Sequence, residues 1–281
     1  MTTAADLNKL VVELRAKTGV GMMDCKKALT EASGDFEAAL PILRKKGLSD
    51  AAKKSARVTK EGAVAYSVAG NTGAIIELNC ETDFVARNEA FVSLAHALAD
   101  KYAKGEFKTV DQAKDLIQPV FMKLGENMGL RRFERFEFQG PGLVAGYIHL
   151  GAKQGALIEL STPNAEAAKR PEAQELAKEL LLQIVGFKPK FLRREDVPSA
   201  EIEKEREIHT ELLRKEGKPE ASIPKIIEGK INKLFYQQLC LLEQMSVRDG
   251  KTPIATIIKD MSAKVGGGVS VTRFARYQLG E

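Results

Sequence analysis

Apolar side chains recur at helical spacing in three short stretches within the first 54 residues. Positions i, i+3, i+4 and i+7 are apolar in the first and third stretches, and the second has a shorter version of this pattern. The apolar faces comprise Leu7, Leu10, Val11 and Leu14; Met22, Cys25, Leu29 and Ala32; and Phe36, Ala39, Leu40 and Leu43. Turns at 18–21 and 33–35 contain glycine, which readily adopts the backbone angles that end a helix. Residues 1–54 are therefore predicted to form a three-helix module, in which Pro41 should kink the third helix or delay its start.

The middle of the chain changes to the patterns of strands and hairpins. A small, polar stretch at 51–60 is predicted to be a linker, and two β-prone runs flank the turn sequence A-G-N-T-G. In order, the predicted elements are a strand at 62–68, a turn at 69–73, a strand at 74–79, a helix capped by Asn88, a helix opened by Asp111, and a strand at 129–138. Together they indicate an α+β unit.

This unit is followed by a second copy of its opening. G-A-V-A at 62–65 recurs as G-L-V-A at 142–145, and G-A-I-I-E-L-N at 73–79 recurs as G-A-L-I-E-L-S at 155–161. A helix predicted at 171–185 follows the second copy, as a helix follows the first. We therefore predict two related α+β subdomains with antiparallel sheets, at 55–140 and 141–281.

The second subdomain also contains a charged helical pair. Residues 199–215 are dense in charge with a thin apolar stripe, and a helix is predicted to restart at Pro224 and to include Leu241. Two helices joined by a short break form a helical hairpin, expected at about 199–245, that can project from the body. The remaining predicted elements are a helix capped by Thr252, with Pro253 in its first position, and a strand at 269–277.

Between the first strand pair and its helix lies the decapeptide N-C-E-T-D-F-V-A-R-N at 79–88. Segments that leave a rigid strand commonly carry function. Alternatively, Thr82 or Asp83 caps a helix and Phe84 packs into the core at the start of that helix. The second copy leaves its strand through S-T-P-N at 161–164 and has no acid–aromatic pair, which a purely structural device would need in both copies. A functional site and a structural cap both stay open from these residues alone.

Composition is that of a globular protein, with an uneven distribution of charge. The 281 residues are 44% hydrophobic and 29% charged, and no apolar run approaches the roughly 18 residues that span a bilayer. The N-terminus lacks the features of a secretion signal or transit peptide, so a cytoplasmic location is expected. Residues 1–60 hold 12 Lys or Arg against 7 Asp or Glu, whereas the other 31 basic and 31 acidic residues cancel. This positive segment can face an acidic partner or a nucleic acid, or be a solvated helical face.

Motifs for catalysis and metal binding are missing from the sequence. There is no phosphate-binding G-x-x-x-x-G-K-[ST], no H-E-x-x-H and no pair of acids placed for acid–base chemistry. The residues that could carry such chemistry are isolated: His96, His149 and His209, and Cys25, Cys80 and Cys240. Three distant cysteines predict neither a disulfide framework nor a zinc site, and His96 is predicted to be structural. We expect no enzyme, no metal site and no cofactor.

A nucleic-acid binder is the alternative from another functional class. The positive N-terminal segment and a pI of about 8.9 permit it. That segment has a single aromatic residue, Phe36, and so lacks a platform for stacking bases. No RRM, KH or zinc-finger signature is present.

Two segments closely resemble signatures of the translation elongation factor Ts family. L-R-A-K-T-G-V-G-M-M-D-C-K-K-A-L at 14–29 is similar to the family's opening signature, with Val20 where Ala is usual. N-C-E-T-D-F-V-A-R-N at 79–88 resembles its second signature, and L-R-K-K-G at 43–47 and the C-terminal R-F-A-R-Y-Q-L-G-E also fit. The resemblance spans essentially the whole chain. It implies an α+β protein in which a UBA-like three-helix module precedes the two subdomains.

The resemblance further implies a guanine-nucleotide exchange factor for elongation factor Tu. The residues carried over are Arg15, Met22 and Met23 for docking on the partner, Thr82, Asp83, Phe84 and Val85 for pressing near its Mg²⁺ site, and His149, on the first strand of the second subdomain, for a further contact. Expected partners are elongation factor Tu, GDP-bound or nucleotide-free, and a second copy through the helical hairpin, which serves dimerisation in some family members. No membrane and no direct nucleic acid contact are expected. An RNA-binding translation accessory protein remains the alternative.

Overall fold

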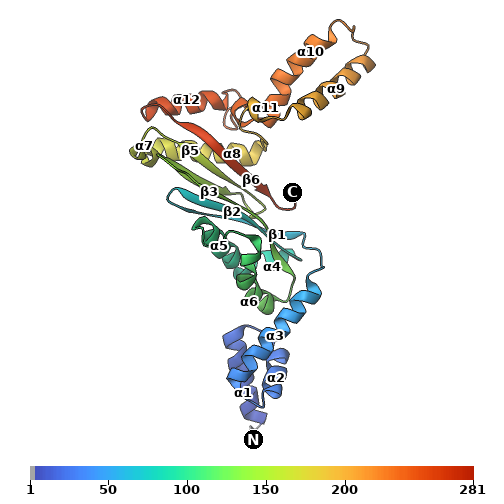
Figure 1. Cartoon of the computed structure of the whole chain (residues 1–281), viewed down its shortest axis with the longest axis vertical. Helices are drawn as coiled ribbons and strands as arrows, with labels where there is room; N and C mark the ends of the chain where they lie inside the picture. The colour runs from blue at the N-terminus through green and yellow to red at the C-terminus, as the bar shows by residue number, and fades with distance from the viewer. Residues whose placement is uncertain (1–3) are drawn as a thin grey trace.

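The computed structural model describes residues 4–281 (Figure 1). A three-helix module lies at one end, two sheets with their covering helices form the middle, and a helical hairpin projects at the other end. This is an α+β architecture, as the sequence pattern predicts. Across the described part of the chain, every helix is too short or too polar to span a bilayer.

The N-terminal module consists of α1 (Ala4–Thr18), α2 (Met22–Glu31) and α3 (Phe36–Lys54). Its predicted apolar faces meet in one core, whose most deeply buried members are Leu14, Cys25, Leu29 and Ala39. Gly19 ends α1 at a positive φ of 72°, and its amide donates to the Arg15 carbonyl at 2.7 Å. The Asp35 carboxylate caps α3 by accepting from the Ala38 amide at 3.0 Å.

Helix α3 is longer than predicted. It begins at Phe36 and continues through Pro41, so this proline does not delay its start. The helix continues to Lys54, so residues 51–54 are helical and the linker is confined to 55–60. Its C-terminal half packs on α6 (Lys114–Leu124), where a Cβ added at Gly47 would lie 2.6 Å from Met122 Cγ. Tertiary packing therefore extends a helix whose own apolar pattern stops at Leu43.

The first subdomain is a sheet covered on one face by helices. Strands β1 (Glu61–Ala69), β2 (Thr72–Cys80) and β3 (Met128–Glu137) pair antiparallel in the order β1-β2-β3. The covering helices are α4 (Asp83–Ala86), α5 (Glu89–Ala103) and α6. A 3₁₀ turn at Val110–Ala113 precedes α6, so Asp111 lies inside this turn instead of opening the helix. Asn88 caps α5 as predicted, accepting from the Ala90 amide at 2.9 Å.

The second subdomain repeats this plan. Strands β4 (Gly142–Ile148), β5 (Gln154–Ser161) and β6 (Ser270–Gln278) pair antiparallel in the order β4-β5-β6. Its covering helices are α7 (Ala165–Lys169), α8 (Pro171–Phe187) and α12 (Ile254–Lys264). Pro253 occupies the N-cap position of α12 without a capping side-chain hydrogen bond, so the helix starts one residue later than predicted and Thr252 is not its cap.

The two sheets pack face to face through reciprocal contacts. Val144 of β4 approaches Gly73 of β2, and Val64 of β1 approaches Gly155 of β5. Two guanidinium groups cross the interface in the same reciprocal way, Arg132 over the Tyr277 ring at 4.2 Å and Arg273 over the Phe136 ring at 4.1 Å. The third strands also repeat in sequence, R-F-E-R-F at 132–136 and R-F-A-R-Y at 273–277, which the sequence analysis missed. The repeat therefore covers all three strands of each sheet.

The projecting hairpin consists of α9 (Ser199–Lys215) and α10 (Ile223–Lys230), which runs into a π-helical turn (Ile231–Phe235) and α11 (Tyr236–Leu239). It has a small core of its own, comprising Leu213, Ile223, Ile227 and Ile231. Leu241 was predicted to lie on this helix, but it does not. It lies in a 3₁₀ turn (Leu241–Glu243) and is buried in the core of the second subdomain. A further 3₁₀ turn, Arg194–Asp196, precedes the hairpin.

Candidate functional site

The decapeptide forms the connection between β2 and α5, here called the first junction (residues 81–88). The one-turn helix α4 lies inside it, and the Thr82 hydroxyl caps this helix by accepting from the Val85 amide at 3.3 Å. Val85 is buried in the core between β2 and α5. The cap predicted at Thr82 is therefore present, and it fixes the backbone that carries Asp83 and Phe84.

Phe84 does not pack into the core. Its exposed fraction is 84%, because the capped turn directs the next residue, Val85, inward and Phe84 outward. The structural interpretation of Phe84 is therefore wrong. A large apolar ring held in solvent on a fixed turn is a surface suited to contact with another molecule.

Asp83 lies beside Phe84 and pairs with Arg87 on the same turn. The carboxylate and guanidinium are 3.1 Å apart, and their side chains are 42% and 81% exposed. An ion pair with this exposure contributes little to stability, so the Asp83 carboxylate can exchange its partner at small cost.

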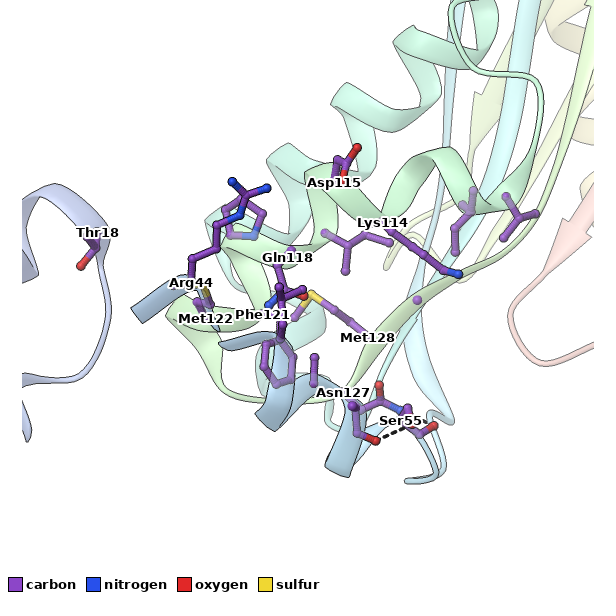
Figure 2. Close-up of a pocket in the computed structure, with 18 of the residues that line it drawn as sticks. Thr18, Arg44, Ser55, Lys114, Asp115, Gln118, Phe121, Met122, Asn127 and Met128 are labelled. Carbon is purple, nitrogen blue, oxygen red and sulfur yellow. Dashed lines mark hydrogen bonds between the residues drawn. The ribbon is translucent and has the colours of Figure 1, made fainter. Parts of the chain in front are cut away.

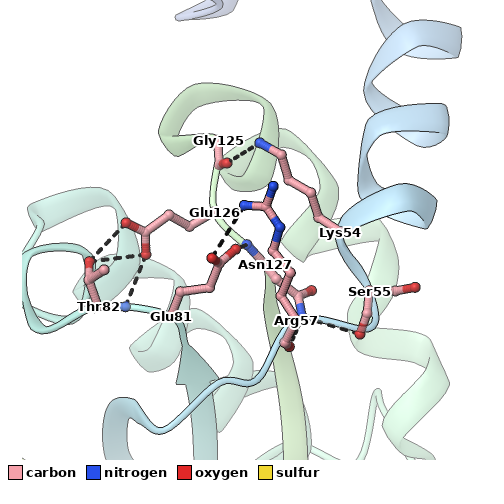
Figure 3. A network of polar contacts seen from close by, with 8 residues as sticks. All are labelled: Lys54, Ser55, Arg57, Glu81, Thr82, Gly125, Glu126 and Asn127. Carbon is pink, nitrogen blue, oxygen red and sulfur yellow. Dashed lines mark hydrogen bonds and ion pairs between the residues drawn. The ribbon is translucent and has the colours of Figure 1, made fainter.

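A carboxylate from another element holds the first junction in place (Figure 3). The Glu126 side chain, between α6 and β3, accepts from the Thr82 amide at 3.1 Å and from the Thr82 hydroxyl at 2.8 Å. Glu81, one residue earlier, accepts from the Asn127 amide at 2.6 Å. Two neighbouring residues of the junction are thus bonded to two neighbouring residues of the α6–β3 loop.

The same loop contacts the end of the N-terminal module (Figure 3). The Lys54 ammonium donates to the Gly125 carbonyl at 2.5 Å. The side-chain amide of Asn127 donates to the Ser55 and Arg57 carbonyls at 3.3 and 2.9 Å. Arg57 also pairs with Glu81 at 3.4 Å. Residues 125–127, here called the G-E-N loop, therefore join the end of α3 to the first junction.

The turn between β4 and β5 reaches the first subdomain near the junction. The Val64 amide donates to the Ala152 carbonyl at 2.7 Å, and Lys153 pairs with Glu61 at 2.9 Å. A small pocket of about 130 Å³ lies here, with Asp83 and Ala152 among the residues that line it. The pocket places the β4–β5 turn of the second subdomain beside the first junction.

His149 was predicted to lie on the first strand of the second subdomain. It lies in this turn instead, because β4 ends at Ile148. Its side chain is exposed, and its Nδ1 lies 3.0 Å from the Tyr147 hydroxyl. Leu150, which the sequence analysis did not single out, has an exposed fraction of 91%. His96, on α5, is also exposed and borders the same small pocket, so it is not a core histidine.

The predicted docking residues of the N-terminal module form a separate surface. Arg15 lies in the last turn of α1 and is exposed, while Met22 and Met23 begin α2 with exposed fractions of 49% and 66%. Both methionines therefore face solvent, and the turn at 18–21 brings them beside the end of α1. The module lies below the sheets in Figure 1, so this surface is not continuous with the first junction.

A cavity of about 960 Å³ lies between α3 and α6, with β3 behind it (Figure 2). Apolar side chains such as Leu48, Ile117 and Met122 line it, together with the charged side chains of Arg44, Lys114 and Asp115. Within residues 4–281, no group of three His, Cys, Asp or Glu is placed to hold a metal ion. The cavity walls provide no general acid–base pair and no activated nucleophile.

The cysteine next to the first junction is not a nucleophile. Cys80 is fully buried, and its thiol donates to the Thr82 carbonyl at 3.2 Å. Burial, reinforced by the nearby charge of Glu126, raises the pKa of this thiol to about 12. Cys80 therefore remains a neutral thiol at physiological pH and acts as a small buried side chain.

Two residues of this region escaped the sequence analysis, Glu126 and Leu150. One signal could have found Glu126. Aligning the third-strand repeats places G-E-N at 125–127 opposite G-G-G at 266–268, so the first copy carries side chains where the second copy has none. Leu150 lies in a turn with no periodic pattern, and no comparable signal identifies it.

Comparison with known proteins agrees over nearly the whole chain. A family model described as Elongation factor TS matches residues 81–281. Elongation factor Ts of Symbiobacterium thermophilum is 45% identical over 279 residues, which cover 97% of this chain and 91% of the relative. The proteins of the same name from Clostridium perfringens and Clostridium botulinum are 42% and 43% identical over 286 residues, 97% of this chain and 92% of each relative. The chain therefore belongs to the elongation factor Ts family of translation elongation factors.

Proposed function

We propose that the protein is a guanine-nucleotide exchange factor that promotes GDP release from elongation factor Tu. The first junction is the element that acts on the partner, with Asp83 and Phe84 pressed against the partner near its Mg²⁺ and phosphate site. The protein makes and breaks no covalent bond in this role, so it is not an enzyme in the chemical sense.

The observation that carries this proposal is the exposure of Phe84 on a capped and buried support. The corresponding position of the second copy, between β5 and α8, is Glu166, which is 82% exposed and pairs with Lys169. The position faces solvent in both copies, so the fold does not require an aromatic ring there. A phenylalanine at such a position contributes to binding instead of to folding.

The expected mechanism follows from how a GTPase holds its nucleotide. GDP is bound through phosphate-loop amides, a lysine and Mg²⁺. A wedge accelerates release if it binds better to the form in which these contacts are disturbed. Burying one phenylalanine in the partner supplies about 1.5–3 kcal/mol toward that difference. Because the coupling is reciprocal, GDP weakens binding of the factor as much as the factor weakens binding of GDP.

Docking is assigned to two further surfaces. Arg15, Met22 and Met23 present one cation and two adaptable thioether side chains around a glycine-containing turn, a combination suited to an apolar groove with an acidic edge. His149, exposed at the tip of the β4–β5 turn, adds a contact from the second subdomain. These contacts hold the factor on its partner while the first junction acts.

The test is stopped-flow release of fluorescent GDP from elongation factor Tu, with the wild type, Asp83→Ala and Phe84→Ala compared at saturating factor. The proposal predicts a large acceleration by the wild type and a strong reduction in both variants. Complex formation with nucleotide-free elongation factor Tu, followed by gel filtration after ribonuclease treatment, should survive in the variants. A wild type that leaves GDP release unchanged would overturn the proposal.

A further inference from the structure

The Glu126 carboxylate makes an unusually complete set of contacts with one residue of the first junction. It accepts from the Thr82 amide at 3.1 Å, and both of its oxygens lie within hydrogen-bond distance of the Thr82 hydroxyl, at 2.8 and 3.1 Å. Hydrogen bonds to a charged acceptor are stronger than those between neutral groups. Thr82 is therefore held at two atoms by a side chain from a different element.

These contacts decide the orientation of the Thr82 hydroxyl. Its proton points to Glu126, which leaves an oxygen lone pair to accept from the Val85 amide at 3.3 Å. Without the carboxylate the hydroxyl is free to rotate, and the cap of α4 is no longer enforced. Since α4 is a single turn, its cap governs the direction in which Asp83 and Phe84 point.

The second copy makes the same kind of junction without such a carboxylate. Asn164 caps α7 by accepting from the Ala167 amide at 2.8 Å, and the loop before β6 has Gly267 where the first copy has Glu126. A strand-to-helix turn of this design therefore does not depend on a carboxylate from the neighbouring loop. The carboxylate occurs in the copy that carries Asp83 and Phe84.

Neighbours of Glu126 extend the contact to the N-terminal module. Asn127 binds the carbonyls of Ser55 and Arg57, Arg57 pairs with Glu81, and the Lys54 ammonium binds the Gly125 carbonyl. Hydrogen bonds joined in one network stabilise one another by more than their separate contributions. The end of α3 and the cap of α4 are thus supported by three consecutive residues.

We propose that Glu126 is a positioning residue for nucleotide exchange: through Thr82 it fixes the direction of Asp83 and Phe84, and through the G-E-N loop it ties that direction to the docked N-terminal module. This role rests on the proposed exchange function. It assigns to the loop a task separate from affinity, because the predicted docking residues lie elsewhere. Preorganisation of this kind raises the rate of the step without adding a contact to the partner.

The experiment measures GDP release from elongation factor Tu as a function of factor concentration for the wild type, Glu126→Ala, Glu126→Gln and the control Asn164→Ala. Glu126→Ala should lower the maximal release rate by about tenfold, the effect of losing hydrogen bonds to a charged group. The factor concentration at half-maximal rate should stay within about twofold of the wild type. Glu126→Gln keeps one acceptor oxygen and should recover part of the rate, and Asn164→Ala should leave the rate unchanged.

Two further readouts separate positioning from a general loss of structure. Hydrogen exchange at the Val85 amide should be faster in Glu126→Ala, while the amides of the Leu157 region in β5 keep wild-type protection. Thr82→Val combined with Glu126→Ala should slow release by less than the product of the two single effects, because the two residues act through shared hydrogen bonds.

The outcomes that overturn the proposal differ from those that overturn the exchange function. A Glu126→Ala protein with the wild-type maximal rate, or with only a raised half-maximal concentration, shows that Glu126 does not position the junction, while the exchange function stands. Wild-type protein that fails to accelerate GDP release overturns the exchange function and this role with it.

Discussion

The two strand-to-helix junctions of this protein share a scaffold and differ in what they present to solvent. Thr82 and Asn164 cap the short helices α4 and α7, and Val85 and Ala167 turn inward at equivalent positions. The second junction (residues 162–170) presents Glu166 where the first presents Phe84. The backbone solution is common to both copies, so the difference lies in the exposed side chains and in the carboxylate that steadies them.

This comparison separates requirements of the fold from those of function. A residue needed for folding should have a counterpart of similar burial and chemistry in the other copy, whereas a residue needed for contact with a partner should have a counterpart of different chemistry, as exposed Phe84 and exposed Glu166 do. Features shared by the copies are therefore expected to affect stability, and features of the first junction alone are expected to affect exchange.

The largest change in the free energy of unfolding is expected from substitution of a buried glutamate that both copies share. Glu77 of β2 is fully buried and accepts from Arg131 at 3.0 Å and Arg132 at 2.8 Å, and Glu159 of β5 accepts from Arg273 at 2.9 Å. Glu77→Gln should lower the free energy of unfolding by about 3 kcal/mol, the low end for a broken buried pair because the guanidinium groups are partly exposed. Urea denaturation of the wild type and the variant measures this difference in the free energy of unfolding.

Glu159→Gln is the matched variant in the second copy and should be destabilising in the same direction. If only one of the two glutamates affects stability, the sheets are not equivalent scaffolds and the comparison between the junctions loses its basis.

Glu77 also gives the comparison a pH dependence. Burial raises the pKa of its carboxyl, but the Gly280 amide, Arg131, Arg132 and Asn79 donate hydrogen bonds to the carboxylate and together hold the pKa below its usual value. A carboxyl with a lowered folded-state pKa stabilises the fold above its unfolded pKa of about 4.3, and this stability is lost as pH falls through the folded value. Urea midpoints between pH 7 and pH 3 should therefore fall more steeply in the wild type than in Glu77→Gln. Parallel curves would contradict this assignment.

The next largest change in the free energy of unfolding is expected where the two sheets approach each other closely. A Cβ added at Gly146 of β4 would lie 2.3 Å from Cδ2 of the Tyr66 ring on β1. Gly146→Ala should therefore destabilise the protein by about 1–3 kcal/mol through overpacking. Gly129→Ala is the control, since Gly129 of β3 has no atom within 4 Å of an added Cβ. Equal thermal midpoints for the two variants would show that the sheets can separate at no cost.

Loss of the cap of either short helix should have a smaller effect on stability, and only one of the two losses should affect exchange. Thr82→Ala and Asn164→Ala should each lower the free energy of unfolding by about 1 kcal/mol, the usual value for a lost cap. GDP release should be slowed by Thr82→Ala alone. If Asn164→Ala slows release to the same extent, exchange depends on overall stability and not on the first junction.

The sequence predicted the parts of this structure that have a repeating pattern. G-A-I-I-E-L-N and its second copy identified two strands, their partners and the relation between the subdomains, and Asn88 identified the start of α5. The third-strand repeat was missed because its two copies share only R-F-x-R over a short stretch, and each third strand has an extra residue, Arg131 or Thr272, at a β-bulge that disturbs its alternation. Helix α3 was predicted too short because its second half is stabilised by packing on α6.

The candidate site was predictable where one residue type stood out against its second copy. Asp83 and Phe84 were found in this way, although the sequence could not decide whether Phe84 points inward. Glu126 was not found, because a carboxylate 44 residues away in a loop has no periodic relation to Thr82. Its role emerges from tertiary contacts, which bring the G-E-N loop against the first junction.

The smallest change in the free energy of unfolding is expected at Phe84, whose proposed role in exchange a single substitution can test. Phe84→Glu gives the first junction the residue of the second junction at an 84% exposed position, so the free energy of unfolding should change by less than about 0.5 kcal/mol. The measurement is the maximal rate of GDP release from elongation factor Tu at saturating factor. We expect a rate at least about tenfold below the wild type, since the ring's burial in the partner is lost. A Phe84→Glu protein that is fully folded and releases GDP at the wild-type rate would contradict it.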